Sequence, residues 1–342
     1  MGSVAVALPS ISGHFHTALP TTQWVLIGYT LTISALLLPM GRLADIAGRK
    51  RIYLIGFVIF VVAACAAGFA PNMTSLIVIR IVQGVGAAMT QGTSMAMIVA
   101  SFPPKERGKA LGLQMSMVGA GGVVGPAIGG LLVEVLGWQW VFFGTAVMAS
   151  VAIISALVLI DSARVGQTRG ARVRYDWIGA ALSTGALIVF LNAMTWAPSA
   201  GYGHPLVILA FAGSAALLVA FVAQELRSSS PMMDIRLFKR RLFAFGVLAS
   251  FLNFLGMQSV RFLMPFYLQA VLGLSPGQEG STGLLAAFTS GLRVAYTAMA
   301  VVVLVGVVAS AFKGPSYEHV DPPSESPETV ASDGRPVRQA AD

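Results

Sequence analysis

Long apolar segments alternate with short polar loops along most of the chain. Nine runs are long enough to cross a bilayer, which takes about 20 helical residues. They lie near 24–41, 52–70, 74–100, 110–133, 138–160, 176–196, 205–223, 242–268 and 283–312. A shorter apolar run at 1–11 is predicted to be part of another helix. The pattern predicts an all-α polytopic membrane protein.

Positive charge is confined almost entirely to alternate loops. Of the 22 lysines and arginines, 19 lie in 42–51, 105–109, 164–174, 227–241 and the residues after 312. The loops between these segments carry none. Since cytoplasmic loops are enriched in Lys and Arg, the basic loops and the C-terminus are predicted to be cytoplasmic. We expect a multi-pass protein of the plasma (inner) membrane.

Composition excludes several other classes of function. Only 11% of the residues are charged, against about 25% in soluble domains. The net charge of +8 is spread over short loops rather than one face, so we expect no nucleic-acid partner. The phosphate-binding pattern G-x-x-x-x-G-K-S/T does not occur, which argues against direct ATP drive. We expect no enzyme, no catalytic residue, no cofactor and no metal site.

The loop after the segment 24–41 has the sequence GRLADIAGRKR over 41–51. Gly41 would let two helices approach closely, and Gly48 would permit a tight turn. Asp45 could pair with a basic group or cap a helix N-terminus. The candidate residues here are Gly41, Arg42, Asp45, Gly48, Arg49, Lys50 and Arg51. The alternative is a basic loop that only fixes topology.

An arginine interrupts the apolar segment 74–100, in the run Arg80-Ile81-Val82-Gln83-Gly84. A charge at this depth costs about 2.5–3.5 kcal/mol, so Arg80 is expected to face the bundle interior and to have a partner. Gln83 lies three residues on and shares its helix face. The alternative is that Arg80 extends its charge to an interface.

Glycines recur along one face of the apolar segment 110–133. Gly121, Gly125 and Gly129 follow one another at four-residue intervals, and they predict a groove for close backbone contact. Pro126 is expected to kink this helix. Helix packing alone would explain these three glycines, but it would not explain the accompanying Gly112, Pro126 and Gly130.

These three patterns together resemble the major facilitator superfamily. The loop 41–51 matches its cytoplasmic signature G-x-L-a-D-r-x-G-r-k-x, and 80–84 matches R-x-x-Q-G. The run 112–130 matches the antiporter pattern g-x(8)-G-x(3)-G-P-x(2)-G-G. The two helices after the central basic loop resemble the insertion of the fourteen-helix drug:proton antiporters.

The resemblance implies a bundle of two halves that rock around a midplane site and export amphipathic small molecules in exchange for protons. It implies that 41–51 latches the two halves. It also implies that Arg80, Gln83 and Gly84 serve coupling, and that the 112–130 helix forms the rocking interface. The implied partners are a small-molecule substrate, protons and the lipid bilayer, with a homo-oligomer possible.

The sequence departs from the family in two places. The family's first helix carries an acidic residue, which would fall before Met1, and an asparagine, where this chain has Ala5. After 278–280 the chain proceeds to 287–293, which resembles the start of the family's final helix. On this resemblance helices ten to thirteen are absent, and we hypothesise an internal deletion near 280.

The expected organisation is therefore a major facilitator bundle with a nearly complete N-terminal half and an incomplete C-terminal half. Its predicted parts are a half-bundle 1–160, a basic loop 161–175, two inserted helices 176–223, a second basic loop 224–241, a two-helix remnant 242–312 and a disordered tail 313–342. Two functions stay open on the sequence. One is a proton-coupled drug exporter, and the other is a transport-incompetent relic or partner-binding membrane subunit.

Overall fold

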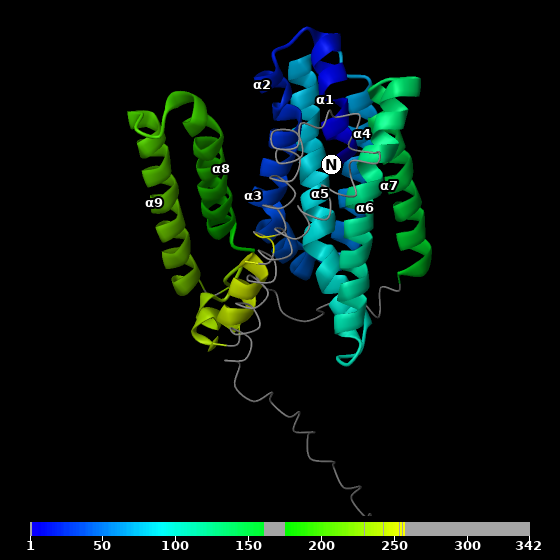
Figure 1. Ribbon diagram of the computed structural model, residues 1–342. Coiled ribbons are helices and arrows are strands. Elements are labelled where there is room, and N and C mark those ends of the chain that lie inside the picture. The colour runs from blue at the N-terminus through cyan, green and yellow to red at the C-terminus, as the bar shows by residue number, and fades with distance from the viewer. Residues whose placement is uncertain are drawn as a thin grey trace, which may run out of the picture. The chain divides into compact units, whose positions relative to one another are not determined.

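A computed structural model describes residues 2–160 and 175–256, apart from 229, 242, 253 and 255. The chain divides into two compact units, Met1–Ile235 and Arg236–Asp342, and each is described by itself. The first unit holds α1 (Gly2–Phe15), α2 (Leu19–Thr22), α3 (Trp24–Ala47), α4 (Arg49–Gly68), α5 (Met73–Ser101), α6 (Arg107–Leu136), α7 (Gln139–Leu159), α8 (Trp177–Ala200) and α9 (Pro205–Arg227) (Figure 1).

Among the described residues, seven helices, α3 to α9, are long and apolar enough to span a membrane. They confirm the first seven runs expected from the sequence. Of the second unit, the structure describes a 3-10 helix that starts at Ile235 and ends at Lys239, and the short apolar helix Phe243–Leu252. The rest of the run 242–268, the run 283–312, the junction near 280 and the tail 313–342 lie outside the described residues.

The first helix is longer than its apolar run. It ends at Phe15 rather than near residue 11, and His14 lies in its last turn. Ile11 and Phe15, four residues apart, lie on one face of the helix and pack with Trp138 in one apolar cluster. This packing explains why the helix continues past residue 11 and includes His14. The His14 and Trp138 ring centroids are 5.5 Å apart.

Helix α5 packs against both α3 and α4 (Figure 1), and glycines permit the close approach on each side. A Cβ atom on Gly86 would lie 2.6 Å from the Gly56 carbonyl oxygen of α4. A Cβ on Gly92 would lie 3.0 Å from the Leu37 carbonyl oxygen of α3. Small residues therefore set the spacing of these three helices, as is common where helices pack within a bilayer.

Helices α8 and α9 form a hairpin that packs on α3 through α8. Pro39 lies inside α3 and is fully buried. Because proline has no amide hydrogen, the Ala35 carbonyl four residues earlier lacks its usual helical donor. The Thr184 hydroxyl of α8 donates to this carbonyl at 3.3 Å. The Tyr175 hydroxyl donates to the Pro39 carbonyl at 3.2 Å.

Thr184→Val should therefore destabilise the docking of the hairpin on α3. The substitution keeps the branched shape but leaves the Ala35 carbonyl without the Thr184 donor. Hydrogen bonds between membrane helices contribute about 0.6 kcal/mol on average, with a maximum of about 1.7 kcal/mol. Unfolding of the purified protein in lipid nanodiscs would measure this loss.

Thr195→Val is the matched control for this prediction. The Thr195 hydroxyl is exposed and donates to Leu191 within its own helix, so no contact between helices depends on it. Equal destabilisation by the two variants would show that the Thr184 bond does not hold the hairpin.

Candidate functional site

Arg80 lies in the interior of the bundle with 3% of its surface exposed. Its Nε atom donates to the Val25 carbonyl oxygen of α3 at 3.0 Å. Its Nη1 atom donates to Oε1 of Gln83, one turn along α5. The guanidinium carbon lies 4.0 Å from the centre of the Tyr29 ring. The expected burial of Arg80 is confirmed, and the alternative that its charge reaches an interface is wrong.

The contacts of Arg80 offset the cost of a buried charge without an opposite charge. Within the described part of the chain, no salt bridge involves Arg80. A desolvated cation over an aromatic face gains about 2 kcal/mol or more. Gln83 is fully buried, and its Nε2 atom has no hydrogen-bond partner among the described residues. The site therefore combines a positive charge with an unused donor, which suits an anionic or acceptor group.

Gly84 brings Arg80 within reach of α3. A Cβ atom on Gly84 would lie 2.8 Å from the Thr32 Cβ and 2.9 Å from the Tyr29 carbonyl oxygen. A larger residue would separate the two helices and withdraw Tyr29 from the guanidinium. The three residues of the R-x-x-Q-G pattern thus supply the charge, the group that orients it and the space for its partner. Sequence reasoning missed Tyr29, because one aromatic in an apolar run carries no signal of its own.

The signature segment 41–51 is mostly helical, which corrects its description as a loop. Helix α3 continues to Ala47 and α4 begins at Arg49, so Gly48 alone separates them. Gly48 has a φ of +101°, which L residues with a side chain rarely adopt. An apolar run marks only the part of a helix that can lie in lipid, whereas helical hydrogen bonding continues into the polar residues beyond it. The helices therefore extend past the ends predicted from the apolar runs.

Within this segment Asp45 pairs with Arg49, the closest contact of the pair being 2.8 Å. Arg49 also donates from Nη1 to the Ala96 carbonyl of α5 at 3.4 Å. Lys50 donates from Nζ to the Ile160 carbonyl just after α7. The segment therefore connects the end of α3 and the start of α4 to the C-terminal ends of α5 and α7. The pairing expected for Asp45 is confirmed, whereas its role in a latch stays a prediction.

Gly41 makes the close helix contact expected of it. A Cβ atom on Gly41 would lie 3.4 Å from the Gly92 carbonyl oxygen of α5. Arg42 keeps its Nε atom buried without a hydrogen-bond partner among the described residues. Arg51 is exposed.

The glycine face of α6 makes close contact over only part of its length. A Cβ on Gly129 would lie 2.5 Å from the Ser3 Cα of α1, and the Ser3 hydroxyl donates to the Gly125 carbonyl at 2.7 Å. Gly121, by contrast, has no described atom within 4 Å of its Cβ position. The expected groove at three glycines is thus filled at two, since α1 meets this face only through its first residues.

The other residues of the antiporter pattern follow the same division. Pro126 lies against Gly2 of α1. A Cβ atom on Gly2 would lie 2.6 Å from the Cγ atom of Pro126. Gly130 faces the Val6 side chain at 3.7 Å. Gly112 has no described atom within 4 Å of its Cβ position.

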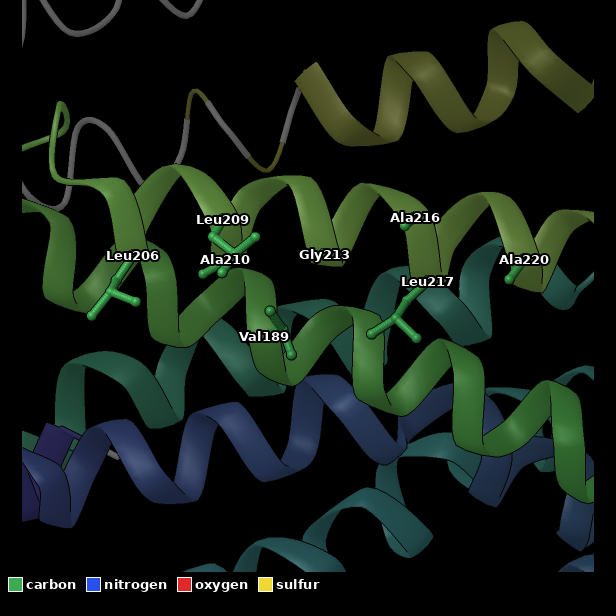
Figure 2. Close-up of a pocket in the computed structure, with 8 residues that line it drawn as sticks. All are labelled: Val189, Leu206, Leu209, Ala210, Gly213, Ala216, Leu217 and Ala220. Atoms are coloured by element: carbon green, nitrogen blue, oxygen red, sulfur yellow. The ribbon is translucent and has the colours of Figure 1, made fainter.

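A separate apolar groove of about 590 Å³ runs along the α8–α9 hairpin. Figure 2 shows it between Val189 of α8 and the α9 residues Leu206, Leu209, Ala210, Gly213, Ala216, Leu217 and Ala220. Its lining has no charged or hydrogen-bonding side chain, so we assign no chemistry to it.

Comparison with known proteins agrees with these motifs. A family model described as the Major Facilitator Superfamily matches residues 1–317. A tetracenomycin C resistance and export protein of Streptomyces glaucescens is 32% identical over 278 residues, covering 81% of this chain and 51% of the relative. A puromycin resistance protein of Streptomyces alboniger is 35% identical over 278 residues, covering 81% and 54%.

A methylenomycin A resistance protein of Bacillus subtilis is similar to the chain to the same degree. It is 33% identical over 282 residues, covering 81% of this chain and 59% of the relative. The chain spans about half the length of the curated relatives it matches. With the family match over residues 1–317, the seven helices of spanning length in the part that the structure describes, and its three motifs, the chain is an integral, multi-pass membrane protein that belongs to the major facilitator superfamily.

Proposed function

We propose that this protein is a secondary active transporter that exports drugs or other amphipathic small molecules in exchange for protons. Several relatives are named as resistance or export proteins, which supports this substrate class. The observation that carries the proposal is the buried Arg80, which is held by Gln83 and by the α3 groups at Val25 and Tyr29. Intramembrane charges of this kind mark coupling and substrate pathways.

The proposed mechanism is alternating access. Arg80, Gln83 and Gly84 serve coupling, since a charge without an opposite charge in the described bundle responds to any change of charge nearby. The Asp45–Arg49 pair and its neighbours in 41–51 form the cytoplasmic latch, because they bind several helix ends at once. The open part of the α6 glycine face, around Gly112 and Gly121, forms the moving interface.

The orientation in the membrane follows from the charge asymmetry of the loops. We propose that the protein lies in the plasma (inner) membrane with its C-terminus in the cytoplasm. We also propose that the chain is divided into the six parts predicted from the sequence, with boundaries near 160, 175, 223, 241 and 312. Where the structure describes the helix ends, those ends replace the predicted ones. A homo-oligomer is a further proposal, in which a second copy would supply the other half of a two-half bundle.

Transport of a fluorescent cationic dye by inverted membrane vesicles tests this function. Uptake that requires the proton gradient, and stops when an uncoupler collapses it, is the expected result. Vesicles from cells without the protein are the control, with insertion confirmed by antibody. Uptake equal to that control, with the protein inserted, would contradict transport and favour a transport-incompetent relic or a partner-binding subunit.

A further inference from the structure

A short basic segment leads into the apolar helix of the second unit. Its sequence over 236–241 is RLFKRR, without an acidic residue. The 3-10 helix Ile235–Lys239 covers its first part, and the apolar helix Phe243–Leu252 follows it. The Arg240 carbonyl accepts from the Phe243 amide at 3.0 Å. The backbone of the basic segment is therefore continuous with the helix, and its charges lie next to the first helical turn.

The cations of this segment create a local positive potential. Lys239, Arg240 and Arg241 are exposed, and within the described part of the chain no salt bridge involves them. Four basic residues and one acidic residue, Asp234, give the stretch 234–241 a net charge of +3. Exposed charges of one sign attract ions of the opposite sign. The positive end of the helix dipole adds to the same potential.

Apolar side chains accompany these cations and continue into the helix. Phe238 is 42% exposed, and the centre of its ring lies 5.1 Å from that of Phe243. In the helix, Val247, Leu248 and Phe251 are 41–62% exposed. Because the chain is a multi-pass membrane protein, this exposed apolar face fits contact with lipid tails. The cations beside it then lie at the level of the lipid headgroups.

The other basic segments that the structure describes have a different character. In 41–51 the Asp45–Arg49 pair uses one of the cations within the protein. In 105–109 the acidic Glu106 lies among the cations. The segment 236–241 differs from both because its exposed cations are combined with an exposed aromatic ring and an apolar helix. This combination is more than a loop needs to fix topology.

We propose that 236–241 is a binding surface for the headgroups of anionic phospholipids. Lys239, Arg240 and Arg241 contact the lipid phosphates, and Phe238 packs among the headgroups beside them. With the orientation proposed above, the surface faces the cytoplasmic leaflet, whose anionic lipids attract polybasic segments next to a spanning helix. The bound lipids hold the start of the helix at a fixed depth in the bilayer. Binding at this surface requires no transport cycle, so it does not depend on the proposed export function.

Titration of the full-length protein with phosphatidylglycerol in detergent, followed by native mass spectrometry, tests this surface. The variant Lys239→Gln/Arg240→Gln/Arg241→Gln removes three charges and keeps Arg227 and Arg236, which maintain the orientation of the loop. A basic residue near an anionic membrane surface contributes about fivefold in affinity. The dissociation constant of the tightest phosphatidylglycerol should therefore rise at least about tenfold in this variant. Binding of phosphatidylcholine should not change.

Two further variants separate this surface from the total charge and from misfolding. Lys105→Gln/Arg107→Gln/Lys109→Gln removes the same charge from another basic loop and should leave the phosphatidylglycerol affinity unchanged. Arg240→Lys/Arg241→Lys keeps every charge and should bind as the parent protein does. Equal losses in the two neutralised variants would show that the lipid responds only to total charge, and this result would overturn the proposal. An unchanged affinity in the 239–241 variant would overturn it as well.

Fluorescence of Phe238→Trp in nanodiscs tests whether the segment lies against the headgroups. Brominated phosphatidylglycerol should quench the added emission more strongly than brominated phosphatidylcholine, after subtraction of the parent emission. This difference should vanish in about 1 M salt, where the Debye length is about 3 Å. Equal quenching by the two lipids at low salt would show adsorption through apolar side chains alone and contradict headgroup binding. If the dye assay fails while these results hold, export is contradicted and the lipid surface stands.

Discussion

Arg80→Leu should reduce proton-driven dye uptake at least about tenfold, which is a loss of about 1.4 kcal/mol in the transport step. Leucine is apolar and close in length to the buried stem of arginine, so the protein should still insert. The variant loses the charge over Tyr29 and the hydrogen bonds to Val25 and Gln83. Initial rates of dye uptake at equal protein levels would measure the effect.

Two companion variants show whether charge or geometry matters. Arg80→Lys keeps the charge but cannot reproduce the planar guanidinium, so its uptake should be intermediate. Lys109→Leu removes a charge of the same sign from an exposed position and should behave as the parent protein. Gradient-dependent uptake by Arg80→Leu at the parental rate would exclude Arg80 from coupling.

Gly84→Ala should both destabilise the bundle core and disturb the Arg80 site. The added Cβ would meet the Thr32 Cβ at 2.8 Å and the Tyr29 carbonyl oxygen at 2.9 Å. A backbone oxygen cannot rotate away, so α3 and α5 must separate. Overpacking of this kind costs about 1–3 kcal/mol. We expect a lower melting temperature in nanodiscs and a loss of dye uptake, because the separation withdraws Tyr29 from Arg80.

Gly119→Ala provides the control for this substitution. Gly119 lies in α6, and no described atom is within 4 Å of its Cβ position. Alanine there should raise stability by about 0.5–1 kcal/mol, since glycine is unfavourable inside a helix. If Gly84→Ala melted at the same temperature as Gly119→Ala, the close approach of α3 and α5 would not be needed for stability.

Hydrophobic pattern and charge predicted the seven spanning helices because both report directly on the bilayer. The burial of Arg80 was predictable for the same reason, since an unpaired charge cannot face lipid. Glycine patterns were predictive only in part. Gly41 makes a close contact, Gly121 has no described atom within 4 Å of its Cβ position, and Gly86 and Gly92 make contacts that no motif had assigned to them.

Contacts that depend on how the helices pack and where the chain turns could not be predicted from the sequence. Tyr29 and Arg80 meet only because α3 and α5 pack closely, and Glu225 reaches Met232 and Met233 only because the chain turns back after α9. At the level of sequence, Glu225 is an acidic residue near a membrane boundary. Its partners are backbone amides, which carry no sequence signal.

The proline of α3 has a consequence for the time course of biosynthesis. The Ala35 carbonyl that Pro39 leaves without its usual donor is bonded by Thr184, which is 149 residues later in the chain. At about 5–20 residues per second, the ribosome needs about 7–30 s to make that stretch. For this interval the Ala35 carbonyl lacks the Thr184 donor and is open to any other donor that it meets. The nascent protein thus has a window for mispairing that closes when α8 inserts.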